Sequence, residues 1–103
     1  MVEDDEISRY YATQARKFPL GHLVATPGAL ARVPAEEQLG ALARHVRGEW
    51  GDALCAEDVE ANEKALVHGN RLFSAYHSKG GVKFYVITEA DRTVTTVLLP
   101  EDY

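Results

Sequence analysis

The segment from Arg71 to Pro100 constrains the fold of this chain more than any other part of the sequence. It holds three short runs that are rich in β-branched and aromatic side chains, which is typical of β-strands. These runs cover residues 72–77, 82–87 and 94–99. Turn-forming residues separate them, with two glycines after the first run and an aspartate after the second. The segment therefore predicts a three-stranded antiparallel meander.

Each predicted strand carries apolar side chains on both of its faces, because successive residues of a strand point to opposite sides. One face is expected to carry the first apolar set: Leu72, Tyr76, Val82, Phe84, Val86, Val94 and Leu98. The opposite face is expected to carry the second set: Phe73, Tyr85, Ile87, Val97 and Leu99. One layer of helices covers one face only. We therefore expect the second face to be covered by the region around Tyr10, Tyr11 and 18–23, or by a second chain.

The middle of the chain predicts a short helix followed by a longer one. Thr26 is a favourable N-cap for the short helix, and Pro27 suits its first position, where the missing N–H has no partner to lose. Pro34 ends the short helix and can open the longer one. The apolar stripe of the longer helix is expected to consist of Ala35, Leu39, Leu42 and Val46.

A third helix is predicted at about 55–68. Acidic residues crowd its N-terminal half, where the helix dipole favours them, and Gly69 can adopt the left-handed conformation that ends a helix. Its buried stripe is expected to consist of Cys55, Val59, Asn62 and Leu66. Because a buried amide needs hydrogen-bond partners, we expect Asn62 to bind the backbone of a neighbouring loop.

These elements, with a short helix at 7–17 and a short strand at 22–25, predict an α+β fold. Two main helices are expected to pack on one face of a three- to four-stranded, mainly antiparallel sheet. A chain of 103 residues has room for one domain, which we place at residues 18–103. We expect residues 1–17 to form an acidic, partly disordered segment.

The net charge of −5 comes mostly from the start of the chain, where four of the first six residues are acidic. The remainder has 12 acids against 11 bases, which argues against a basic nucleic-acid-binding surface and against an acidic DNA mimic. Cys55 is the single cysteine, which excludes an internal disulfide and is typical of a reducing compartment. No signal peptide or membrane-spanning run is recognisable, so we expect a cytoplasmic protein that does not enter a membrane.

The sequence contains no recognisable catalytic motif. Its four histidines lack the spacing of a helical metal site, and a lone cysteine makes no zinc cluster. The glycines form no phosphate-binding loop, and no serine lies in a nucleophile elbow. We therefore predict no catalytic residue, no metal and no cofactor, and we expect a protein that is not an enzyme.

The stretch RHVRGEWGD places Trp50 between two glycines and close to two basic side chains. We expect its indole to fold back and close the core between the helices. The alternative is that Trp50 anchors a partner, because tryptophan and arginine are common in interface hot spots. On this alternative the partner-binding residues are Trp50, Arg47, His45, Arg71 and Tyr85.

A wider pattern over residues 18–103 combines the spacing of Glu57, Asp58 and Asn62 with four stretches: VATPGAL, RHVRGEWGD, RLFSAY and ITEADRTVTTVLLPEDY. This pattern resembles a family of small bacterial proteins found mostly on plasmids and other mobile elements. Some members carry the label of a type I restriction endonuclease subunit, but this chain is too short for a methyltransferase domain and has no cofactor-binding glycine loop. The resemblance implies a setting in mobile bacterial DNA and no particular activity.

These observations favour a non-enzymatic interaction module, an accessory protein of a mobile element that binds another protein or its own copy. One alternative is a small ribonuclease of the toxin type, with His77, Arg71 and Tyr85 as acid–base and phosphate-contacting residues. A second alternative is an anti-defence inhibitor that mimics DNA. The nearly neutral charge of the body argues against both alternatives.

Overall fold

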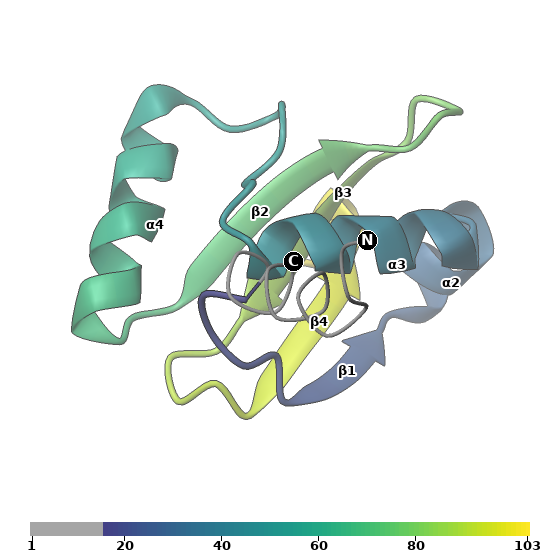
Figure 1. Cartoon of the computed structure of the whole chain (residues 1–103). Helices are drawn as coiled ribbons and strands as arrows, with labels where there is room; N and C mark the ends of the chain where they lie inside the picture. Colours follow the sequence, from purple (N-terminus) through teal and green to yellow (C-terminus); the bar gives the residue numbers. More distant parts are fainter. Residues whose placement is uncertain (1–15) are drawn as a thin grey trace, which may run out of the picture.

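The computed structural model describes residues 16–103 (Figure 1). In chain order its elements are β1 (His22–Ala25), α2 (Pro27–Arg32), α3 (Ala35–Val46), α4 (Ala56–His68), β2 (Leu72–His77), β3 (Lys83–Thr88), β4 (Val94–Leu98) and the 3-10 helix η1 (Pro100–Asp102). The described part has the predicted α+β fold, in which three α-helices, two of them long, pack on a four-stranded sheet. The predicted helix at 7–17 lies almost entirely outside the described residues.

The sheet has the strand order β1-β4-β3-β2. β2, β3 and β4 form the predicted antiparallel meander. β1 adds a fourth strand that runs parallel to β4, with Leu23 opposite Thr95 and Ala25 opposite Val97. The sheet is therefore mixed but mostly antiparallel, and β1 and β2 form its two edges.

The pairing of β4 with β3 corrects one prediction. Val86 lies opposite Val97, so these two side chains share a face, and Val94 and Leu98 point to the other side. This is the reverse of the arrangement predicted from the sequence. The turn between the strands decides it: Arg92 takes a left-handed conformation with a φ of 62°, and a change of one residue in a turn moves every side chain of the next strand to the other face.

α3 crosses one face of the sheet, and the short α2 packs beside its N-terminal end (Figure 1). Together with this sheet face they enclose the larger apolar cluster, which consists of Ala29, Val33, Ala41, Leu42, Tyr76, Phe84, Val86, Val97 and Leu99. A smaller cluster lies between α4 and the start of the described chain, and it consists of Phe18, Trp50, Ala65 and Leu72. The core is thus concentrated on the helix side of the sheet.

The buried stripe of α3 is rotated from its predicted position. The buried residues are Gln38, Ala41, Leu42, His45 and Val46. Two of the predicted positions are therefore correct, but Ala35 and Leu39 are exposed. Gln38 accounts for the rotation, because its amide donates to the carbonyl oxygens of Ala29 (3.3 Å) and Val33 (2.9 Å) and so closes the end of α2.

The other face of the sheet is partly covered by the C-terminal residues. Tyr103 follows η1 and lies against Phe73 and Tyr85, with ring centroids 6.2 and 6.1 Å away. Phe18 packs with the helix-side cluster instead, so this part of the N-terminal region does not cover the second face as predicted. Tyr10 and Tyr11, named in the same prediction, lie outside the described residues.

The edge of the sheet at β2 is closed by the chain itself. The side chain of Asn62 donates to the carbonyl oxygen of Phe73 (2.7 Å) and accepts from its N–H (3.0 Å). Next along the edge, the N–H of Ala75 donates to the carbonyl oxygen of Trp50, and the N–H of Ala53 donates to the carbonyl oxygen of Ala75. Asn62 is buried and binds backbone, as predicted, although its target is a strand rather than a loop.

A glycine lets the loop before α4 approach this strand closely. Gly51 has a φ of +95°, and a Cβ at this position would lie 2.0 Å from the carbonyl oxygen of Ala75. A side chain at residue 51 is therefore excluded both by the backbone conformation and by space.

The N-terminal end of α4 corrects a second burial prediction. Cys55 is the N-cap residue and is exposed, with its thiol donating to the carboxylate of Asp58 at 3.3 Å. The predicted stripe otherwise points inward, because Asn62 is buried and Val59 and Leu66 are half-buried. α4 lies beside β2 rather than across the sheet, so its first turn extends beyond the strand (Figure 1).

Replacing Asn62 by alanine is expected to lower the free energy of unfolding by about 2 kcal/mol. Each net hydrogen bond contributes about 1 kcal/mol, and both backbone groups of Phe73 would lose their partner. Urea denaturation measures the change, and Asn70→Ala, at an exposed asparagine, is the matched control. An Asn62→Ala variant as stable as the control would contradict the role of this side chain at the edge.

Candidate functional site: an apolar groove beside β1

Most of the exposed large apolar side chains in the described part of the chain gather beside β1. They are Leu23 and Val24 of β1 (54% and 47% exposed), Leu30 of α2 (65%) and Leu39 of α3 (63%). Only Val67 and Tyr103 of this class lie elsewhere among residues 16–103. We call the surface between β1 and α3 the β1 groove, and its main lining residues are Leu20, Gly21, Leu23, Leu39, Leu42 and Val46.

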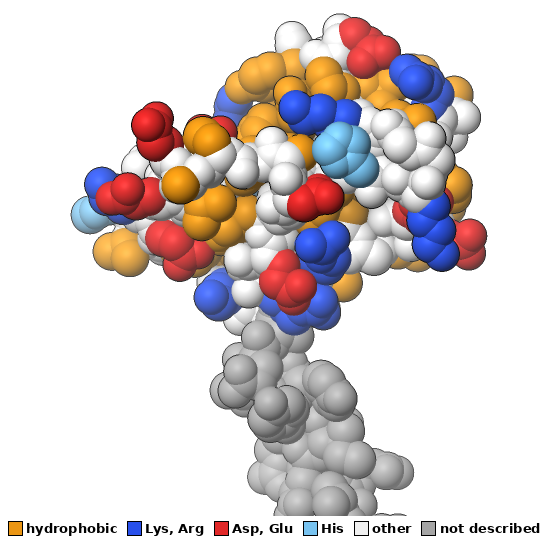
Figure 2. Space-filling model, turned by 90° about the horizontal axis from the view of Figure 1, so that it is seen from above, with side chains coloured by type: hydrophobic (Ala, Val, Ile, Leu, Met, Phe, Trp, Pro, Cys, Tyr) orange, Lys and Arg blue, Asp and Glu red, His pale blue; other side chains and the backbone are white. Residues whose placement is uncertain are grey.

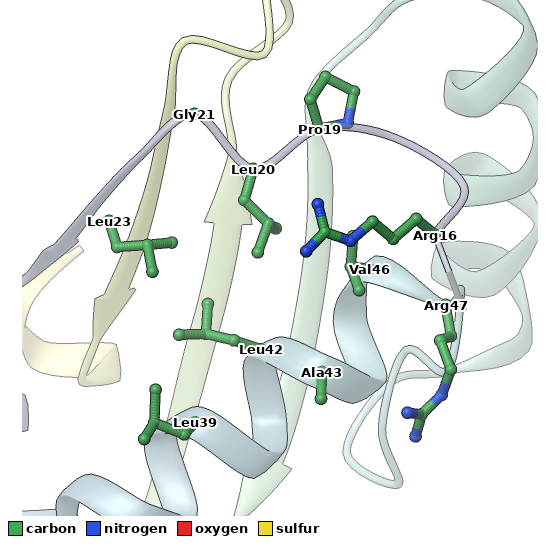
Figure 3. A pocket seen from close by; sticks show the side chains of 10 residues that line it. All are labelled: Arg16, Pro19, Leu20, Gly21, Leu23, Leu39, Leu42, Ala43, Val46 and Arg47. Carbon is green, nitrogen blue, oxygen red and sulfur yellow. The ribbon is translucent and has the colours of Figure 1, made fainter. Parts of the chain in front are cut away.

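The β1 groove consists of two adjoining hollows of about 550 and 250 Å³, which share Leu23, Leu39 and Leu42. Figure 3 shows these three side chains pointing into the space between the strand and the helix. Arg16 and Arg47 lie at the end of the groove where α3 finishes. The groove is therefore apolar along its length and basic at one end.

The backbone of β1 has one free edge within the described structure. The N–H groups of His22 and Thr26 donate to the carbonyl oxygens of Thr93 and Val97, at 2.8 and 3.0 Å, on the side of β4. Hydrogen-bonding groups alternate in direction along a strand, so those of Leu23 and Ala25 point away from the sheet. Natural edge strands are usually protected by a charge, a proline or a cover, and the sequence HLVA of β1 holds no Lys, Asp, Glu or Pro.

A second feature of the molecule is a buried chain of hydrogen bonds through His45. Nδ1 of His45 contacts Oγ of Ser74, and Nε2 contacts Oγ1 of Thr88 at 2.9 Å. Oγ1 of Thr88 is 2.7 Å from Oγ1 of Thr95, which donates to the carbonyl oxygen of Leu20 at 2.7 Å. Since a carbonyl accepts only, each hydroxyl along the chain has one possible direction. Ser74 therefore donates to Nδ1, and the neutral ring carries its proton on Nε2.

This network cannot act on a substrate in the conformation described. A serine bound to a histidine resembles a nucleophile with its base, but Ser74, His45, Thr88 and Thr95 each have 0% exposed surface. Burial, and in second place the charge of Arg92, lower the pKa of His45 to about 3. The arrangement suits a neutral structural histidine that joins α3 to β2 and β3.

Two of the five predicted partner-binding residues are buried. Trp50 is 4% exposed and packs its indole against Phe18 and His45, so it closes the core as the favoured interpretation predicted. The side chain of His45 also has no surface to offer a partner. Arg47 is half-exposed at the C-terminal end of α3, donates to Glu49 at 2.7 Å and reaches the β1 groove.

The other two predicted residues, Arg71 and Tyr85, meet on the opposite side of the sheet. They line a hollow of about 420 Å³ together with Phe73, Lys83 and Tyr103. His77, their partner in the ribonuclease hypothesis, does not line this hollow. It lies at the far end of β2 from Arg71, about 20 Å away along an extended strand. The structure thus brings together two of the three residues of that hypothesis.

Apart from Arg47, the residues of the groove were not among the predicted site residues. Leu39 was predicted to lie on the buried stripe of its helix, and Leu23 was predicted only as part of a short strand and of the region 18–23 that could cover the second sheet face. The available signal was the absence of charge from residues 22–25, which is unusual for a strand that ends at an edge.

Among residues 16–103, no three His, Cys, Asp or Glu side chains gather as metal ligands would, and no helix there is long and apolar enough to span a membrane. On the face shown in Figure 2, acidic, basic and apolar side chains are interspersed. Comparison with protein-family models, with curated proteins and with solved structures gives no match.

Proposed function

We propose that this protein is a non-enzymatic interaction module, an accessory protein of a bacterial mobile element, that binds a polypeptide in the β1 groove. The observation that carries the proposal is the coincidence of exposed apolar side chains with a free strand edge. Contiguous apolar patches on the surface of a folded chain mark interaction sites, and an open strand edge is a template for another strand. The mobile-element setting comes from the sequence resemblance.

The proposed mode of binding is the addition of an extended strand to the sheet. The outward N–H and C=O groups of Leu23 and Ala25 supply main-chain hydrogen bonds, which are independent of the partner's sequence. The hollows between β1 and α3 then receive apolar side chains on one face of the added strand. Arg16 and Arg47 favour an acidic residue at one end.

Affinity capture from a bacterial lysate tests this function. The baits are the wild type, Leu39→Lys and Val67→Lys. Leu39 and Val67 are both exposed, but only Leu39 lines the groove. The wild type and Val67→Lys are expected to retain the same polypeptide, and Leu39→Lys to retain at least tenfold less. Equal retention of the polypeptide by all three baits would contradict the proposal. So would a wild-type bait that retains no polypeptide at all, where an untagged copy of this chain counts as a retained polypeptide.

A further inference from the structure

We infer that the polypeptide bound in the β1 groove is a second copy of this chain, which pairs its own β1 strand antiparallel to the first. The inference rests on the proposed function, because it names the partner of the same groove. The two four-stranded sheets then join into one continuous sheet across a two-fold axis. Such an interface is isologous, since the same surface serves both copies.

The backbone of β1 is complementary to itself in this arrangement. Two residues that lie directly opposite in an antiparallel pair exchange two hydrogen bonds when the N–H and C=O groups of each point towards the other strand. With the axis at Val24, Leu23 of each copy lies opposite Ala25 of the other, and both outward-facing residues of the strand are paired. In a register shifted by two residues, either Leu23 or Ala25 lies opposite the same residue of the second copy. The other of these two residues then has no partner within β1. The structure therefore favours the register centred on Val24.

The side chains of β1 fit this register as well. Val24 is 47% exposed and points to the face away from α3, so the two Val24 side chains meet at the axis. A pair of this kind has the shorter Cα separation, about 4.5 Å, which brings cross-strand side chains into contact. On the helix side, Leu23 of one copy is placed beside Ala25 of the other, and the two β1 grooves become continuous.

The charges at the ends of the groove are also complementary under the same axis. α3 runs antiparallel to β1, since Leu20 and Gly21 lie near Val46 and Ala25 lies near Ala35. The end near Val46 carries Arg16 and Arg47.

The opposite end of the groove has no charged lining residue, but acidic side chains lie next to it. Glu36 lies in the first turn of α3, and the carboxylate of Asp102 accepts from the hydroxyl of Thr26, next to Ala25. A two-fold axis through β1 brings the basic end of each copy towards these acidic side chains of the other. A partner that carries the same groove therefore satisfies both ends at once.

A pair of charge variants at the axis tests the inference. Val24→Lys and Val24→Glu each place like charges opposite one another in the dimer, whereas a mixture of the two places opposite charges there. Light scattering across a hundredfold dilution gives the association state of the full chain, and Val67→Lys on α4 is the matched control at an exposed valine. Circular dichroism confirms that each variant is folded.

The wild type and Val67→Lys are expected to be dimers with the same dissociation constant. Val24→Lys and Val24→Glu alone are expected to dissociate at least tenfold more readily, and their mixture to recover the dimer. A wild type that is monomeric at every concentration overturns the inference, as does a dimer that neither charge variant weakens.

Hydrogen exchange separates the other possible occupants. If the wild type is monomeric but the N–H groups of Leu23 and Ala25 are protected at all concentrations, the chain's own N-terminal residues occupy the edge and the inference fails. If it is monomeric and Leu39→Lys still abolishes capture of another protein, the proposed function stands and the second copy is excluded. If the wild type is monomeric and captures no more protein than Leu39→Lys does, the proposed function fails as well.

Discussion

Replacement of Trp50 by alanine is expected to lower the free energy of unfolding by about 3–5 kcal/mol, which is typical of a buried large aromatic side chain. The indole is 4% exposed and joins Phe18, Ala65 and Leu72 in the smaller core cluster. Its Nε1–H donates to the carboxylate of Glu63 at 2.7 Å. Whole domains are stable by about 5–15 kcal/mol, so this single change removes a large share of the total.

Two variants separate the packing of Trp50 from its hydrogen bond. Trp50→Phe keeps an aromatic ring in the cluster, and Glu63→Ala removes only the acceptor, which lies on an exposed residue of α4. Glu63→Ala is expected to cost about 1 kcal/mol and Trp50→Phe less than Trp50→Ala. Because the chain has one tryptophan, the fluorescence of the wild type reports this site alone. A red-shifted, readily quenched emission with an unchanged stability of Trp50→Ala would contradict the burial.

The helices and strands could be predicted from the sequence because their signals are local. Thr26 and Pro27 predict the start of α2. In the structure the hydroxyl of Thr26 accepts from the N–H of Ala29, three residues further along the chain. Gly69 ends α4 in the left-handed conformation expected of a glycine there. Neither contact depends on how the chain folds at a distance.

The faces of these elements could not be predicted in the same way, since contacts between distant residues decide them. Gln38 is buried because carbonyl groups at the end of α2 need its amide. Arg92 is a charged residue in a turn, yet its guanidinium donates to carbonyl oxygens of Ala65, Asn70 and Glu89 and so fixes the start of β4. The apolar pattern alone gives no sign of either requirement.

The candidate site depends on the same kind of information. Residues 22–25 were predicted as a strand, but only the strand order β1-β4-β3-β2 shows that this strand is an edge of the sheet. The other edge is closed by Asn62 and by the loop at Trp50, so among residues 16–103 β1 is the open edge. An open edge is a property of the whole sheet, so no single segment of the sequence reveals it.

The stability of the protein is expected to fall by about 2 kcal/mol between pH 7 and pH 5 because of His45. Burial, with a smaller contribution from Arg92, lowers the pKa of this residue from 6.5 to about 3. In this window the unfolded chain binds a proton at residue 45 and the folded chain does not, so protons favour unfolding. The contribution is complete above pH 6.5 and is lost as the pH falls towards 3, by about 1.4 kcal/mol for each pH unit.

The hydrogen-bond chain explains why the folded protein resists protonation at His45. Nδ1 accepts from Ser74, and Nε2 already donates to Thr88, so a second ring proton would force Ser74 to reverse its hydroxyl beside an unscreened charge. Replacing His45 by glutamine keeps a donor and an acceptor but removes the titration. This variant is therefore expected to lose the pH dependence between pH 7 and pH 5, whatever its absolute stability.

Urea denaturation at pH 7, 6 and 5 measures the effect, with His68→Gln as the matched control at an exposed histidine. The carboxylates of Glu49 and Asp91 also have lowered pKa values, chiefly through hydrogen bonds from Arg47 and Thr93, but they titrate below this window. His68→Gln should keep the wild-type slope. Equal slopes for the wild type and His45→Gln would show that the folded chain accommodates the proton, and the neutral, one-directional chain from Ser74 to the carbonyl of Leu20 would then be wrong.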